Sequence, residues 1–208
     1  MRFRMLGQGR IMSDMLIKNV VVVGVDKLLA RQAVRCRAGK IEWVGPAAQA
    51  QRRPGDQVVD GKGGYLAPGF IDLHVHGMHR HLTDRGSAEL SALCSLLPRY
   101  GVTSFLATVC PRPAGEDAEF LASLACTKHD GAQVLGFHLE GPFLKLAGAL
   151  PRRVMGKADV ARVKALINAA KPLKAIFSVA PDFEGIGDLI PVMARRGTPV
   201  FMTHTGAS

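Results

Sequence analysis

The stretch "FIDLHVHG", residues 70 to 77, places two histidines one residue apart at the end of an apolar run. Side chains alternate between the two faces of a β-strand, so His74 and His76 share a face, and Asp72 points the same way. Two imidazoles together at the end of a strand can either share a metal ion or belong to a polar core. The rest of the sequence decides between these alternatives.

Strands and helices alternate from this stretch to the end of the chain. Apolar runs predict strands, and apolar residues at helical spacing between them predict helices, the first with Ser87 as its N-cap. The predicted strands are the end of 57–77 and residues 102–108, 132–141, 174–181 and 199–207; the predicted helices are 87–100, 115–129, 157–170 and 186–197. This alternation is typical of a parallel α/β sheet.

The chain before residue 70 consists of short strands and turns. Residues 15–25 and 33–45 are predicted strands, and the second contains a hairpin whose turn is Ala38–Gly39–Lys40. Gly39 provides the positive φ that such a turn needs. Residues 1–14 are predicted to be a disordered extension.

Composition excludes several classes of protein. The 208 residues are 48% hydrophobic and 21% charged, as in a soluble globular protein. The net charge of +10 permits nucleic-acid binding, but the arginines are scattered or paired without interleaved aromatics, so we expect no nucleic-acid partner. No apolar run is long enough to cross a bilayer, and we expect no membrane association. The four cysteines form no C-x-x-C pair, which favours free thiols in the cytoplasm.

Polar residues end the predicted strands of the alternating part. His138 and Glu140 end the third strand, and His204 ends the fifth. The carboxyl ends of parallel strands meet at one edge, where α/β folds build their sites. Glu140 ends the apolar run "VLGFHLEGP", where an unpaired carboxylate is costly, so a metal or a cationic partner must neutralise it. We expect the remaining loop histidines to be structural: His79, His81 and His129.

Five motifs together resemble the N-acetylglucosamine-6-phosphate deacetylase family of the amidohydrolase superfamily. They are "APGFIDLHVHG" (67–77), "GVTSFLATVCP" (101–111), "FHLEGPFL" (137–144), "SVAPD" (178–182) and "THTGAS" (203–208). The resemblance runs from about residue 15 to the last residue. It implies an incomplete (β/α)₈ TIM-type barrel, strands one to five, over residues 61–208, preceded by part of a small β-sandwich domain over residues 15–60.

The resemblance also implies a metal site. Glu140 and His204 correspond to metal ligands of the family, and His74 and His76 match the pair that some members use for a second ion. The implied cofactor is one or two divalent ions, zinc first. His138 corresponds to a polar inner-barrel residue below Glu140 and is not counted as a ligand.

Two departures from the family limit what the chain can do. The family continues with a Lys-Gly-x-His segment whose histidine contacts the sugar, whereas here Ala149 and then Leu150 follow Gly148. Ala149 and Leu150 are therefore the predicted substrate-binding positions, without the histidine. The catalytic aspartate of the family lies on the eighth strand, beyond residue 208, so we predict no catalytic residue in this chain and expect a truncated, inactive form.

The implied reaction is hydrolysis of N-acetylglucosamine 6-phosphate to glucosamine 6-phosphate and acetate, with the metal activating a water. The expected partners are this small-molecule amino-sugar phosphate and, at full length, further copies of the chain. One alternative is a cyclic amidase of the dihydroorotase or hydantoinase kind, although its carboxylated lysine would have to be Lys174, at the wrong end of its strand. The other is a non-catalytic, degenerate fragment.

Overall fold

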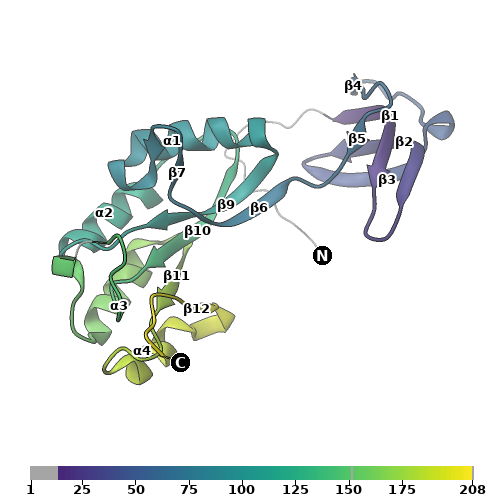
Figure 1. Ribbon diagram of the computed structural model, residues 1–208. Coiled ribbons are helices and arrows are strands. Elements are labelled where there is room, and N and C mark those ends of the chain that lie inside the picture. The colour runs from purple at the N-terminus through teal and green to yellow at the C-terminus, as the bar shows by residue number, and fades with distance from the viewer. Residues whose placement is uncertain (1–13, 151, 208) are drawn as a thin grey trace. The chain divides into compact units, whose positions relative to one another are not determined.

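Residues 14–150 and 152–207 are described by a computed structural model, in which the chain divides into two compact units between Pro68 and Gly69 (Figure 1). The predicted domain boundary at residue 60 lies earlier than this division, because the short strand that follows it still pairs within the first unit. The predicted extension 1–14 lies outside the described residues except for Asp14. None of the described helices is long and apolar enough to cross a membrane.

The first unit is one five-stranded sheet. Its order is β3-β2-β1-β4, and β5 also pairs with β1. β1, β2 and β3 are antiparallel neighbours, whereas β4 and β5 run parallel to β1. The strands are β1 (Met15–Val23), β2 (Leu28–Arg37), β3 (Lys40–Pro46), β4 (Gln57–Asp60) and β5 (Tyr65–Leu66), with a 3₁₀ helix, η1, at Ala47–Gln49.

The hairpin between β2 and β3 confirms the predicted turn with one change. Arg37 pairs with Lys40, so the loop is only Ala38 and Gly39. Both have positive φ, 48° and 72°, as a two-residue turn of type I′ requires. The positive φ of Gly39 was predicted, and that of Ala38 was not.

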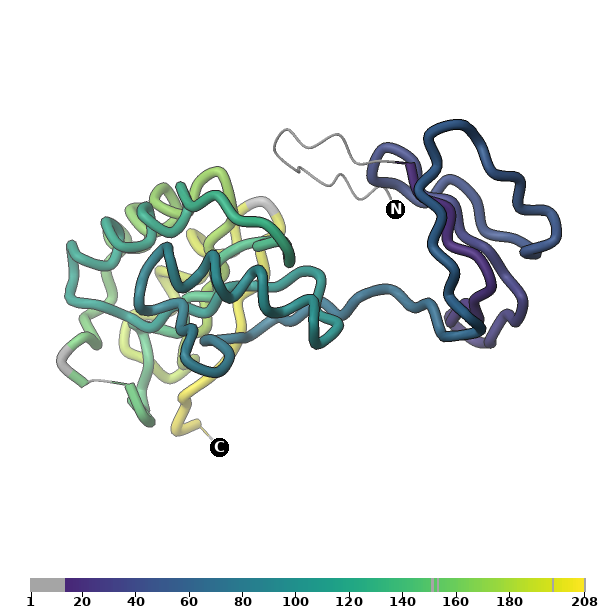
Figure 2. The backbone as a smooth tube through the Cα atoms, turned by 90° about the horizontal axis from the view of Figure 1, so that it is seen from above, coloured from purple at the N-terminus to yellow at the C-terminus, as the bar shows by residue number. Residues whose placement is uncertain are grey.

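The second unit contains a curled half-barrel of five parallel strands in the order β12-β11-β10-β9-β6 (Figure 1). Figure 2 traces the backbone of the same unit from above. Each strand pairs with the next strand of the half-barrel along the chain, as the predicted alternation requires. The strands are β6 (Phe70–Val75), β9 (Val102–Val109), β10 (Gln133–Glu140), β11 (Lys174–Val179) and β12 (Val200–Met202), and a small hairpin of β7 (Gly77–Met78) and β8 (His81–Leu82) follows β6.

Four α-helices connect and cover these strands. They and the 3₁₀ helices are α1 (Ser87–Leu96), α2 (Glu116–Ala125), α3 (Val160–Ala169), α4 (Ile186–Met193), η2 (Thr83–Arg85), η3 (Leu97–Tyr100), η4 (Arg152–Val154) and η5 (Arg195–Gly197). The predicted N-cap Ser87 is wrong. The cap position is Gly86, at φ 110°, and no side chain caps α1. The carboxylate of Asp159, by contrast, accepts hydrogen bonds from the backbone of Ala161 and Arg162 at the start of α3.

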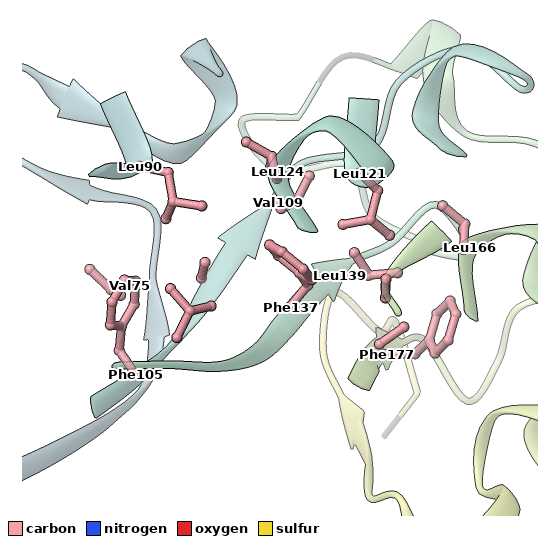
Figure 3. Packing of buried hydrophobic residues seen from close by; sticks show 14 of the residues in the cluster. Val75, Leu90, Phe105, Val109, Leu121, Leu124, Phe137, Leu139, Leu166 and Phe177 are labelled. Atoms are coloured by element: carbon pink, nitrogen blue, oxygen red, sulfur yellow. The ribbon is translucent and has the colours of Figure 1, made fainter. Parts of the chain in front are cut away.

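The apolar core of this unit lies between the helices and one face of the sheet (Figure 3). Phe105, Phe137 and Phe177 are fully buried on three neighbouring strands, and Leu121 and Leu166 pack on them from α2 and α3. Because strand side chains alternate, the residues between them face away from the helices. Those alternate positions carry polar side chains, of which Glu140 belongs to the candidate site: Thr108, His138, Glu140 and Ser178.

Candidate metal centre

Three histidine side chains converge on the carboxylate of Glu140, the buried last residue of β10. The Nε2 atoms of His76 and His204 lie 3.0 Å and 3.1 Å from its two oxygens, and that of His74 lies 3.9 Å away. The Nε2 atoms of His74 and His76 are 3.2 Å apart. The structure therefore brings together all four residues that the sequence suggested as metal ligands.

Strand geometry explains how His74 and His76 reach the site. His74 lies in β6 and His76 directly follows its last residue, and both side chains point toward Glu140, as the alternation of side chains predicts. Asp72 does not join them. Its carboxylate accepts a hydrogen bond of 3.0 Å from the backbone N–H of His74 and so stays with its own strand.

A backbone contact fixes the orientation of His204. Its Nδ1–H donates to the carbonyl of Leu146 at 2.9 Å, and the N–H of Leu146 donates to the carbonyl of His204 at 2.9 Å. With Nδ1 protonated, Nε2 of the neutral ring presents a lone pair toward the carboxylate of Glu140. Two acceptors that face each other across 3.1 Å need a cation between them or a second proton on the ring.

The donor set fits a divalent metal ion. The ligand atoms of His74, His76 and Glu140 all lie within 4.8 Å of one another, close enough to share one ion, and His204 adds a further nitrogen to the same carboxylate. Imidazole nitrogen and carboxylate oxygen are ligands that suit zinc and similar ions. The three imidazoles and the buried, negatively charged carboxylate of Glu140 can thus hold a metal ion.

Two loops hold His204 in place, and neither was foreseen from the sequence. Gly148, at φ 57°, lies so close that a Cβ there would be 2.7 Å from Cε1 of His204. Asp182 accepts hydrogen bonds from the hydroxyl of Thr205 at 2.7 Å and from the N–H of Gly206 at 3.0 Å. The hydroxyl of Thr205 is the main cause that lowers the pKa of Asp182 below its usual range.

His138 lies next to this group without joining it. Its Nδ1–H donates to the carbonyl of Leu73 at 2.8 Å, and its Nε2 accepts from the hydroxyl of Ser178. Its ring stacks on Phe201 and lies 4.5 Å from the ring of His74. Burial lowers the pKa of His138 and favours the neutral ring. Both of its nitrogens are therefore occupied within the protein.

For the other sequence-selected residues the structure shows contacts outside the Glu140 group. Ala149 is exposed, Leu150 is half-buried, and the N–H of Leu150 closes a turn onto the carbonyl of Ala147 at 2.9 Å. Neither side chain has a polar group to offer a sugar. The remaining histidines bond locally: His79 to Tyr100, His81 to Glu89 and His129 to the carbonyl of Thr127.

Two further residues on the far side of His76 escaped the sequence analysis. Cys110, interpreted only as a free thiol, places Sγ 3.6 Å from Nδ1 of His76. Asp84 accepts a hydrogen bond from the N–H of Cys110 at 3.0 Å. Burial, with Asp84 as the next cause, raises the pKa of the Cys110 thiol. The available signal was the position of Cys110 directly after an apolar strand.

Comparisons with known proteins identify relatives over most of the chain, although no protein-family model matches it. The chain is 32% identical to N-acetylglucosamine-6-phosphate deacetylase of Bacillus subtilis (strain 168) over 93% of its length, and 34% identical to that of Lysinibacillus sphaericus over 94%. It spans 51% of the length of each of these curated relatives. The crystal structure of the enzyme of the same name from Pasteurella Multocida has the same fold, with a TM-score of 0.79 at 21% identity, over 93% of this chain and 52% of that one.

Proposed function

The chain belongs to the N-acetylglucosamine-6-phosphate deacetylase family of the amidohydrolase superfamily, and from this we propose that it carries the metal-binding rim of a deacetylase. The proposed reaction is hydrolysis of N-acetylglucosamine 6-phosphate to glucosamine 6-phosphate and acetate. The observation that carries the proposal is the convergence of three imidazoles on Glu140 at the carboxyl ends of the strands.

We propose zinc as the metal, held by Glu140 and His204, with His74 and His76 available for a second ion. When bound, such an ion polarises the amide carbonyl and makes a water more acidic. The protein contributes orientation. Glu140 is buried at the end of a rigid strand, and the hydrogen bond to the carbonyl of Leu146 fixes the tautomer of His204, as outer partners of metal ligands commonly do.

The proposed substrate contacts come from the loop that contains Gly148. Ala149 and Leu150 occupy the loop after Gly148, and we propose that they contact the sugar through backbone and apolar atoms, since their side chains donate no hydrogen bond. The resemblance assigns proton transfer to an aspartate outside these 208 residues. We therefore propose that turnover requires that aspartate, whereas metal binding does not.

The cyclic-amidase alternative is disfavoured by the position of Lys174. This lysine is exposed and is the first residue of β11, where it pairs with Gly136 in the middle of β10, whereas Glu140, the last residue of β10, pairs with Ser178. A carboxylated Lys174 would thus lie at the opposite end of the sheet from the four metal-ligand candidates. We also propose a cytoplasmic location, which the four free cysteines support, and self-association of the complete enzyme.

The test is metal content. In the 208-residue chain loaded with zinc, Glu140→Gln should lower the affinity by about 100-fold or more, because it removes the charge on which all three imidazoles converge. Glu119→Gln, on the exposed face of α2, is the matched control and should retain the metal. In a version that includes the catalytic aspartate, acetate release should fall in parallel. Unchanged zinc stoichiometry in Glu140→Gln would reject the assignment.

A further inference from the structure

A second group of metal-ligating atoms lies on the other side of the His76 ring. It consists of Nδ1 of His76, a carboxylate oxygen of Asp84 and Sγ of Cys110, all within 4.8 Å of one another. Sγ of Cys110 and Nδ1 of His76 are 3.6 Å apart. A single zinc-like ion binds sulfur at about 2.3 Å and nitrogen or oxygen at about 2.0–2.2 Å, so these separations allow one ion to reach all three.

The backbone holds this group together. The N–H of Cys110, directly after β9, donates to Oδ1 of Asp84 in η2 at 3.0 Å. The N–H of Thr83 donates to the carbonyl of His76 at 2.8 Å, which ties η2 to the end of β6. The three side chains therefore come from segments that are bonded to one another.

We propose that His76, Asp84 and Cys110 form a separate site for a thiophilic divalent cation such as Cd²⁺ or Zn²⁺. Thiolate ligands select soft ions, and the imidazole and the carboxylate complete a mixed set that such ions accept. Binding forms a bond from Sγ to the cation, breaks the S–H bond and releases the proton to solvent. The negative charges of the thiolate and Asp84 then outweigh the positive charge of the Arg112 guanidinium, which donates to the carbonyl of Asp84 at 2.7 Å.

His76 can serve only one of the two groups at a time. Its Nε2 lies 3.0 Å from Glu140 and its Nδ1 lies 3.6 Å from Cys110, but a neutral imidazole has one lone pair. A cation held by Nδ1 leaves Nε2 protonated and donating to Glu140. A thiophilic ion at this site therefore withdraws His76 from the Glu140 group, and this inference stands whether or not the chain takes part in deacetylation.

The experiment titrates the metal-free chain with Cd²⁺ and follows the ultraviolet charge-transfer absorption of a cadmium–thiolate bond. The expected result is one such bond per chain, lost in Cys110→Ser and weakened about tenfold or more in Asp84→Asn. Cys126→Ser removes an exposed cysteine and is the matched control, in which the band should persist. Glu140→Gln should also retain the band, which separates this site from the proposed zinc centre.

Three results would overturn the proposal. The first is a band that survives in Cys110→Ser. The second is a band that falls as much in Cys126→Ser as in Cys110→Ser, which an unfolded chain would also give. The third is the absence of any band. None of these results bears on the zinc stoichiometry of the Glu140 group, so the two assignments fail independently.

Discussion

The two compact units differ in how much apolar surface each buries. Among the described residues of the first unit, few apolar side chains are fully or nearly buried: Leu16, Val20, Ala33 and Val34. In the second, α1 to α4 cover the half-barrel, and its buried cluster extends from Val75 to Met193. Burial of apolar area is the main stabilising term in folding, so the second unit gains much more stabilisation from its core than the first.

Among the described residues, each unit also contains a buried arginine–aspartate pair, and the two pairs have different surroundings. Arg162 and Asp117 meet at 2.7 Å and join α3 to α2 beside the large core. Arg35 and Asp56 meet at 3.1 Å, where Asp56 also accepts from the N–H of Arg53 and Arg35 donates to the carbonyl of Gln51. An ion pair of the same kind thus adds to an apolar core in the second unit and closes a loop over a single sheet in the first.

Spectroscopy can follow the two units separately. Trp43, the only tryptophan of the sequence, lies in β3 of the first unit. All α-helices in the described part of the chain belong to the second unit. Tryptophan fluorescence therefore reports the first unit, and the helical circular-dichroism signal reports the second.

The largest expected effect is that of a cavity in the second unit. Phe137 is fully buried between β10 and the helices (Figure 3). Phe137→Ala should lower the free energy of unfolding of this unit by about 3–5 kcal/mol through lost burial and the cavity left behind. The unfolding transition followed by circular dichroism should shift to lower stability, whereas the transition followed by Trp43 fluorescence should not change. In Leu16→Ala the fluorescence transition should shift and the circular-dichroism transition should not. Equal shifts of both transitions in either variant would contradict two units that unfold independently.

A smaller effect separates the site from the fold. Gly148→Ala would place a Cβ 2.7 Å from Cε1 of His204, so we expect zinc affinity to fall about tenfold through displacement of that ring. Gly197→Ala is the matched control, because Gly197 also has a positive φ, 69°, but nothing lies within 4 Å of its added Cβ. Equal loss of zinc in both variants would show that backbone strain, rather than contact with His204, is responsible.

Local patterns predicted part of the site, and the reasons are physical. Alternation along β6 put His74 and His76 on one face, and the rule that parallel strands end at one edge brought Glu140 and His204 to them. The shared face of the two histidines and the positions of the strand ends both follow from the periodicity of the strands, which can be read from a single sequence. The parallel order of the five strands followed from the same alternation of strands and helices.

The residues that escaped prediction lie outside the α-helices and long strands. Asp84 lies in the short 3₁₀ helix η2, Gly148 in an irregular segment and Asp182 just after β11, so their neighbours depend on how these connecting segments pack. No spacing in the sequence encodes such contacts. The wrong N-cap at Ser87 has a different cause: α1 already includes Ser87, and the cap position before it is Gly86, whose φ of 110° suits glycine because it has no Cβ.

The smallest expected effect is a difference in acid sensitivity between the units. The N–H of Arg53, the largest cause, and the side chain of Arg35 lower the pKa of Asp56 in the folded first unit. The folded state thus favours the charged form, so this contribution is complete above the unfolded value of about 3.9 and is lost as the pH falls through the lower folded value. The stability of the first unit, followed by Trp43 fluorescence, should therefore fall over that acid range. Asp56→Asn should be less stable at neutral pH, and its stability should depend less on pH. Asp26 is exposed in the β1–β2 turn, so Asp26→Asn should keep the slope of stability against pH of the unchanged chain. If Asp56→Asn also kept that slope, the Arg35–Asp56 pair would not stabilise the loop.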